Sequence, residues 1–188
     1  RILAQVTITT GGPILDQLHY RWRNDNGTEN SSSYIADEDT ALTSGVYVGD
    51  RRRLRFLVSN TGGATASNIT YRLEHSSTTC SAWMPVATPS TLTSEHWVMD
   101  PSDKVGDSSA SSNPGGLTDP VSKSFVSGYV MTFNNQTPVH TMTNSEFTEL
   151  EYSLRSTGNV TTNTTYCFRL TNAGVATSFS YTQQPQVI

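Results

Sequence analysis

Apolar and polar residues alternate along the first ten residues of the chain. Ile2, Ala4, Val6 and Ile8 alternate with Leu3, Gln5, Thr7 and Thr9, which is the period of a half-buried β-strand. The sequence Gly-Gly-Pro at 11–13 then separates this strand from the rest of the chain. This pattern predicts a strand and hinge over residues 1–13 and a single β-sandwich domain over residues 14–188.

The two-residue period recurs downstream at intervals typical of a sandwich. It predicts strands over 18–22, 54–58, 69–73, 125–133, 148–154, 166–170 and 179–181. The Asn-Thr-Gly-Gly turn at 60–63 predicts either a hairpin or a crossing between two sheets. A helical period persists nowhere over three turns. We therefore expect an all-β protein with an immunoglobulin-like or Greek-key sandwich, or a jelly roll, preceded by an N-terminal extension strand.

Charge and composition narrow the function classes. Only 15% of the residues are charged and the net charge is -4, which disfavours nucleic-acid binding because counterion release needs a basic surface. The arginines at 51–53 and 55 alternate along a predicted strand, which favours a solvated sheet face.

The composition also bears on the location of the protein, because abundant Ser and Thr with scarce Lys are typical of exported β-proteins. No apolar segment is long enough to span a membrane, and the start at Arg1 suggests a removed signal peptide or a trimmed chain. We expect an extracellular or cell-surface location.

Two residue patterns suggest covalent modification. The chain has two cysteines, Cys80 and Cys167, which favour one disulfide over a pair of buried thiols and are too few for a zinc site. Asn-x-Ser/Thr sequons make candidate glycosylation sites of Asn26, Asn30, Asn68, Asn135, Asn159 and Asn163. Several fall at predicted turns, although a chain so rich in Asn, Ser and Thr also contains such sequences by chance.

Signatures of catalysis are missing from the sequence. The four histidines are scattered without paired-ligand spacing, and neither a Gly-x-Ser-x-Gly elbow nor a phosphate-binding loop is present. Glu149 and Glu151 are two apart on one strand, so we expect them on its outer face rather than across a glycosidase cleft. We predict a protein that is not an enzyme and has no cofactor or metal.

Two binding hypotheses remain open at this stage. Asp100, Asp103 and Asp107 lie in a polar segment over 100–119, where a solvated loop is favoured over a calcium site because the spacing is not that of an EF-hand. Trp22, Trp83 and Trp97 suggest a sugar-stacking platform. Trp22 shares its predicted face with Leu18 and Tyr20, which favours a core position, whereas polar flanks make Trp97 the better binding candidate.

Two segments resemble known modules. The sequences LRFLVSNTG at 54–62 and TYCFRL at 165–170 resemble strands of immunoglobulin-like surface modules. Together with LHYRWRNDNG at 18–27 and RRLR at 52–55, they make the chain similar to secreted proteins of environmental bacteria that have no assigned activity. This resemblance implies export and a β-sandwich.

The leading functional prediction is a subunit of an extracellular filament. Each subunit would donate residues 2–8 into a groove on the next copy, with Ile2, Ala4, Val6 and Ile8 as anchors. Burial of these side chains would contribute roughly 4 to 8 kcal/mol before ordering costs. The simplest alternative is that the segment is the first strand of its own sandwich. Other hypotheses are a carbohydrate-binding or adhesive module, one domain of a larger surface protein and, last, a secreted hydrolase.

Overall fold

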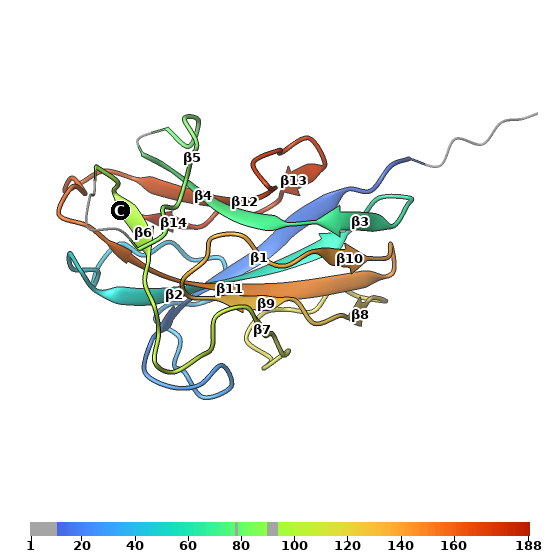
Figure 1. The fold of residues 1–188 in the computed structure, drawn as a ribbon, viewed down its shortest axis with the longest axis horizontal. Helices are drawn as coiled ribbons and strands as arrows, with labels where there is room; N and C mark the ends of the chain where they lie inside the picture. Colours follow the sequence, from blue (N-terminus) through green and yellow to red (C-terminus); the bar gives the residue numbers. More distant parts are fainter. Residues whose placement is uncertain (1–10, 78, 90–93) are drawn as a thin grey trace, which may run out of the picture.

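The computed structural model describes residues 11–77, 79–89 and 94–188, and these residues form strands, turns and loops without a helix (Figure 1). The chain is therefore all-β, as predicted. The strands are β1 (Leu15–Asn24), β2 (Arg51–Asn60), β3 (Ala66–Ile69), β4 (Tyr71–Ser77), β5 (Met84–Pro85), β6 (Trp97–Met99), β7 (Ser109–Ala110), β8 (Ser124–Phe125), β9 (Tyr129–Met131), β10 (His140–Met142), β11 (Glu146–Ser156), β12 (Tyr166–Asn172), β13 (Phe179–Tyr181) and β14 (Gln186–Val187). Among these residues nothing forms a helix that could cross a membrane. The strand expected before residue 11 lies outside the described residues.

Three long strands form the centre of the larger sheet. β2 lies between β1 and β11 and pairs antiparallel with both, while β13 extends the sheet beyond β1 and β9 and β7 extend it beyond β11. The pairings of β13 with β1 and of β9 with β11 are parallel. The sheet is therefore mixed.

A second sheet, in the order β14-β12-β4-β5, packs against the first. Side chains from both sheets form one hydrophobic cluster, with Trp22 and Phe56 from the larger sheet and Leu73, Phe168 and Leu170 from the smaller one. The chain moves from β2 to β4 after the Asn-Thr-Gly-Gly turn, and β4 pairs with β12 rather than with β2. Of the two predictions for this turn, the crossing between sheets is therefore confirmed, and the architecture is that of a β-sandwich.

A register shift in β1 changes which face each of its residues occupies. The pairing of β1 with β2 shifts between Gln17 and His19. Leu18 consequently packs with Leu57 and Phe147 in a small separate cluster, not with Trp22 in the main core. The prediction that Leu18 and Trp22 share a face was wrong, because a bulge reverses the alternation of side chains.

The strand predicted over 125–133 is broken into two short pieces. β8 and β9 both pair parallel with β11, and the segment between them bends at Gly128. A Cβ atom added there would lie 2.4 Å from the Glu149 carbonyl oxygen, so the chain passes too close to β11 for a side chain.

The 100–119 segment also differs from the solvated loop that the sequence predicts, since it contains β7 and the buried residues Ser111 and Leu117.

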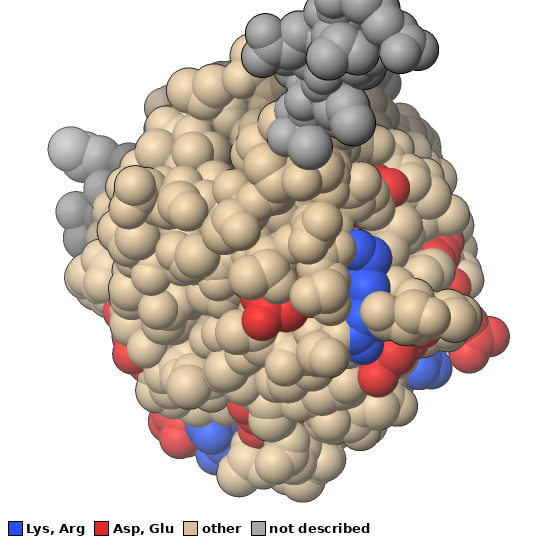
Figure 2. Space-filling view, turned by 90° about the vertical axis from the view of Figure 1, so that its right-hand side faces the viewer, with Lys and Arg blue, Asp and Glu red and all other residues tan. Residues whose placement is uncertain are grey.

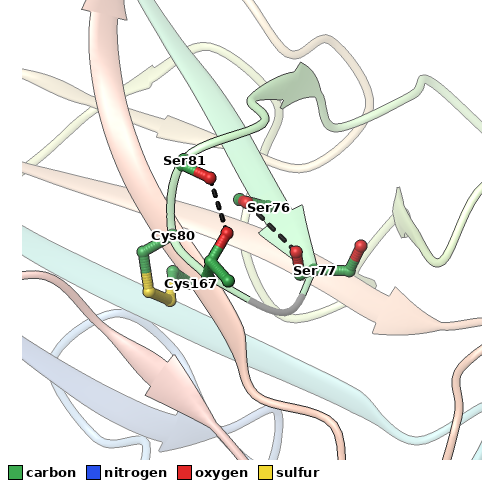
Figure 3. The surroundings of a disulfide bond; sticks show 6 residues. Ser76, Ser77, Cys80, Ser81 and Cys167 are labelled. Atoms are coloured by element: carbon green, nitrogen blue, oxygen red, sulfur yellow. Dashed lines mark hydrogen bonds between the residues drawn. A yellow bond between two sulfur atoms is a disulfide. The ribbon is translucent and has the colours of Figure 1, made fainter.

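The predicted disulfide is present between Cys80 and Cys167 (Figure 3). It joins the turn after β4 to the second residue of β12, with the two Cα atoms 5.4 Å apart. Cys167 pairs across the sheet with Ser76, so the bridge fastens a turn to the strand beside it. The sequence separation of 87 residues makes the closed loop long, a situation in which a cross-link restricts the unfolded chain most.

Candidate assembly site

The described chain begins at a fixed point on one end of the sandwich. The Thr61 amide donates to the Ile14 carbonyl oxygen at 2.8 Å, just beyond the paired ends of β1 and β2. A Cβ atom added to Gly62 would lie 2.3 Å from the Gly12 carbonyl oxygen and 2.4 Å from the Ile14 nitrogen. The glycine turn after β2 thus packs directly on the predicted hinge at Gly11–Pro13. Residues 2–8, which carry the predicted donor anchors, lie before this point and outside the described residues.

The surface around this exit point carries both uncharged and charged groups. Figure 2 views the molecule from this end: uncharged side chains cover its upper part, and Lys, Arg, Asp and Glu side chains lie across its middle and along its right and lower parts. Ile14, directly beside the exit, is 45% exposed. Lys123 also lies at this end, since its ammonium donates to the Asn60 carbonyl oxygen at the end of β2.

A hollow opens between two loops that follow β1 and β11. We call it the end pocket, and its volume is about 350 Å³. Val46 and Val48 line it from the loop over 43–49, Val160 lines it from the loop over 157–165, and Trp97 and Tyr166 line it from β6 and β12. Thr43, Ser44, Thr161, Thr162 and Thr164 add hydroxyl groups. None of the described side chains that line it is charged. Sequence reasoning missed this site because its walls come from distant segments.

The exit point and the end pocket lie at opposite ends of the long strands. β11 pairs with β2 from Phe147 opposite Ser59, near the exit point, to Arg155 opposite Arg51. The next residue, Ser156, lines the end pocket. In Figure 1 the described chain begins at the right-hand end, whereas the C-terminus lies toward the left with β14. Eleven residues of strand separate the two features by roughly 35 Å.

Charged side chains cover the outer face of the large sheet, but they are buried. Arg53, Arg55, Glu149 and Glu151 are each 0% exposed. Loops over 25–33 and 111–118 lie on this face: the Arg53 guanidinium donates to the Gly27 carbonyl oxygen, and that of Arg55 donates to Ser112. The prediction of a solvated arginine face was therefore wrong. Glu149 and Glu151 lie on the outer face, as predicted, but that face is covered and not exposed. The covering loops come from parts of the chain that strand periodicity does not describe.

Glu151 is the centre of this buried network. Its carboxylate oxygens accept hydrogen bonds from Arg23 at 2.7 Å, Arg53 at 2.8 Å and Arg55 at 2.9 Å, and Arg55 also binds Glu149. Burial by itself would raise the pKa of Glu151, but attraction by the three guanidinium groups outweighs burial and lowers it. For Glu149, burial outweighs the attraction of Arg55 and raises the pKa. The two carboxylates share one face with arginines, and this is a structural network rather than a glycosidase pair.

The tryptophans do not form a sugar-stacking platform. Trp22 and Trp97 both pack edge-on against Phe168, at centroid distances of 5.5 and 5.2 Å. Trp22 is 0% exposed, as predicted, but Trp97 is only 1% exposed, so the prediction of an accessible binding residue there was wrong. Trp83 is partly buried, and the Arg169 guanidinium lies over its ring at 4.3 Å. Its face is therefore occupied within the protein.

One of the six candidate glycosylation sites is blocked by folding. The Asn135 side chain is 7% exposed. Its amide donates to the carbonyl oxygens of Leu73 and Val86 and accepts from the Leu73 nitrogen, so the folded protein offers no acceptor nitrogen there. The other five are exposed, namely Asn26, Asn30, Asn68, Asn159 and Asn163.

The three loop aspartates do not converge on a calcium site. Asp100 binds Arg51 and Arg155, Asp103 binds Lys104 next to it, and Asp107 accepts from backbone amides of 132–134. Each carboxylate therefore has its own partners, and Asp107 serves as a cap for a turn.

One histidine–carboxylate group combines residues that the sequence separates. His19 Nδ1 lies 2.7 Å from an Asp39 oxygen and 3.3 Å from a Glu38 oxygen, and these are the described residues that could together hold a metal ion. Both carboxylates also have partners within the protein: Asp39 accepts a hydrogen bond from the Tyr20 amide, and Glu38 accepts hydrogen bonds from the amide and hydroxyl of Thr118. We assign the cluster the structural role of fastening residues 37–39 and 118 to β1.

Comparison of the chain with protein-family models, with curated proteins and with solved structures gave no match. The resemblance to secreted bacterial β-sandwich proteins therefore stays a prediction.

Proposed function

We propose that this protein is a structural subunit of an extracellular filament or pilus, which polymerises when residues 2–8 of one copy add as a strand to the next. The proposal assigns it a role in assembly rather than in catalysis. It also includes export, a cell-surface or extracellular location and a homopolymer as the functional form.

The observation that carries this proposal is the fixed exit point. The predicted hinge packs on the glycine turn after β2, at one end of the sandwich. The segment beyond it has apolar residues on alternate positions and no charge between Ile2 and Thr10. A donated strand that starts from a base fixed on the sandwich would reach a neighbour in a constant direction, and main-chain hydrogen bonds to a sheet edge would then provide affinity.

The folded sandwich has several features that suit a subunit of a long-lived filament. The sandwich has its own hydrophobic core, a disulfide and a buried charge network. An immunoglobulin-like or Greek-key topology, with the jelly roll as its alternative, belongs to this proposal, and the crossing from β2 to β4 supports it. Glycans at the exposed sequons would add bulk on the outside of the polymer.

The test is electron microscopy and sedimentation of the purified full-length chain beside its Val6→Asp variant. We expect filaments from the natural chain and none from Val6→Asp, because a carboxylate on the anchoring face cannot be buried without a partner. Thr7→Asp is the matched control, since it adds the same charge to the opposite face and should still polymerise. Filaments from Val6→Asp, or none from the natural chain, would refute the proposal.

A carbohydrate-binding or adhesive role is the second candidate, favoured by another hollow. Arg72, Thr88, Asn134 and Gln136 help to line a space of about 430 Å³ beside β4 and β5. Guanidinium, amide and hydroxyl groups are the donors and acceptors that sugar hydroxyls require. A chain that stays monomeric and binds oligosaccharides in a way that Gln136→Ala abolishes would support this role.

A further inference from the structure

We propose that the end pocket is the acceptor site, and that it takes the aliphatic side chains of residues 2–8 from a second copy of this chain. The inference rests on the proposed polymerisation and adds the surface on which each subunit receives its neighbour.

The chemistry of the end pocket matches that of the proposed donor. Its apolar lining comes from Val46, Val48 and Val160, together with Trp97 and Tyr166, which are only 1% and 3% exposed, and its Ser and Thr residues add hydroxyl groups. The donor segment likewise has aliphatic anchors on one face and Gln5, Thr7 and Thr9 among the residues of the other. Aliphatic groups can therefore enter the pocket while the polar face meets threonines and water.

Exposed apolar residues mark this end of the molecule as incompletely covered. Tyr47 is 72% exposed, Val48 is 61% exposed and Ile188 is 52% exposed, and Val48 and Ile188 both line the pocket. Neighbouring exposed apolar groups around a hollow are typical of interaction sites. Covering them would add apolar burial to each contact between subunits.

The size and charge of the pocket limit the occupant. A volume of about 350 Å³ is near the lower end for ligand sites, which suits the side chains of a segment better than a protruding folded element. The described side chains that line the pocket carry no charge that could pair with a charged ligand. The hollow beside β4 and β5 is larger but is lined by the polar residues Asn134 and Gln136, which an uncharged aliphatic strand would have to desolvate at a cost.

The end pocket lies at the end of the molecule opposite to the exit point, which allows the contact between two subunits to repeat from copy to copy. Because the exit point and the end pocket lie at opposite ends of β11, a donor can fill a neighbour's pocket while its own pocket remains open. Such a heterologous contact does not close on itself, so it produces a fibre. The ten residues before Gly11 span at most about 35 Å when extended, enough to reach into an adjacent subunit.

The experiment uses three full-length variants. Val48→Asp places a charge at the pocket, Val6→Asp places one on the donor segment, and Val139→Asp is the matched control because Val139 is also 61% exposed but lies outside the pocket. We expect at least a tenfold loss of polymer for the first two and normal polymer for the control. Circular dichroism of each variant establishes that the sandwich is folded.

Mixing the two defective chains provides the decisive measurement. Val6→Asp retains an intact pocket and Val48→Asp retains an intact donor, so an equimolar mixture should form a one-to-one dimer that grows no further. Polymers from Val48→Asp, with none from Val6→Asp, would overturn the pocket assignment and leave strand donation in place. Polymers from Val6→Asp would refute donation itself and the acceptor site with it.

Discussion

Individual buried charges determine how the outer face of the large sheet is organised. Three guanidinium groups surround the carboxylate of Glu151, and the loops that cover them supply carbonyl oxygens to the remaining donors. Each arginine alone would be costly to bury, but a shared, hydrogen-bonded partner offsets much of that cost. The network therefore fixes where the loops over 25–33 and 111–118 lie on the sheet.

Removal of the central charge should destabilise the protein strongly. Glu151→Gln keeps the shape of the side chain but leaves three buried guanidinium groups facing a neutral amide. We expect the free energy of unfolding to fall by about 3 to 5 kcal/mol, measured by urea denaturation. Asp103→Asn is the control, because that carboxylate is 72% exposed beside Lys104, and its effect should stay within about 0.5 kcal/mol. Equal effects of the two substitutions would contradict a stabilising network.

The burial of these arginines could not be predicted from strand periodicity alone. Alternation identified Leu54, Phe56 and Val58 as core residues, and they are buried. The same alternation places Arg53 and Arg55 on the opposite face without indicating whether water or another segment covers it. The covering residues lie 26 or more positions away, for example Glu29 and Ser112.

At the scale of elements, the turn after β2 determines where the N-terminal segment leaves the body. Gly62→Ala would place a methyl group against backbone atoms of Gly12 and Ile14, which cannot move as a flexible side chain can. We expect a loss of about 1 to 3 kcal/mol in stability. Hydrogen exchange at the Thr61 amide should become faster, because that amide bonds to Ile14.

Gly158→Ala is the control for this substitution, because an added Cβ there has no neighbour within 4 Å. It should leave the exchange rate at Thr61 unchanged. If Gly62→Ala also left that rate unchanged, the packing of the hinge on the turn would be unsupported.

The long strands were predictable as elements, and so was the short β13 at 179–181, whereas the other short strands were not. Period-two patterns located β1, β2, β4, β11 and β12 within a few residues of their observed bounds. The break between β8 and β9 depends on the close approach of Gly128 to the Glu149 carbonyl oxygen, and the bulge in β1 depends on its pairing with β2. Both are tertiary effects that a local pattern does not contain.

At the scale of the whole molecule, the candidate assembly site depends on how distant segments meet. The sequence alone suggests the proposed donor segment and its hinge, because alternation and Gly-Gly-Pro are local features. The end pocket combines residues from 43–48, Trp97, 156–166 and the C-terminal strand. No spacing rule connects these segments, so the end pocket could be recognised, and proposed as the acceptor site, only once the two sheets were placed together.

The free energy of unfolding should depend on pH because the buried ring of His75, in β4, lies next to the ring of His96. His75 is 0% exposed, neither ring nitrogen has a hydrogen-bond partner among the described residues, and the His96 ring lies 6.1 Å away. Burial, with a smaller contribution from His96, lowers the pKa of His75 to about 4 from 6.5. Between these values the unfolded chain binds the proton and the folded chain does not. The stabilisation is therefore complete above pH 6.5 and is lost as the pH falls toward 4.

The expected loss across this window is about 3 kcal/mol, measured as the free energy of unfolding at several pH values. His75→Phe removes the titrating group and should flatten the dependence relative to the natural chain. Carboxylates titrate in the same range and contribute equally to both proteins, so the difference between the two curves isolates His75. Parallel curves would show that the proton is accommodated without unfolding. A flattened curve for His75→Phe would instead show that burial of the neutral His75 ring makes the fold sensitive to acid, a sensitivity that the proposed filament would share because its subunits are folded sandwiches.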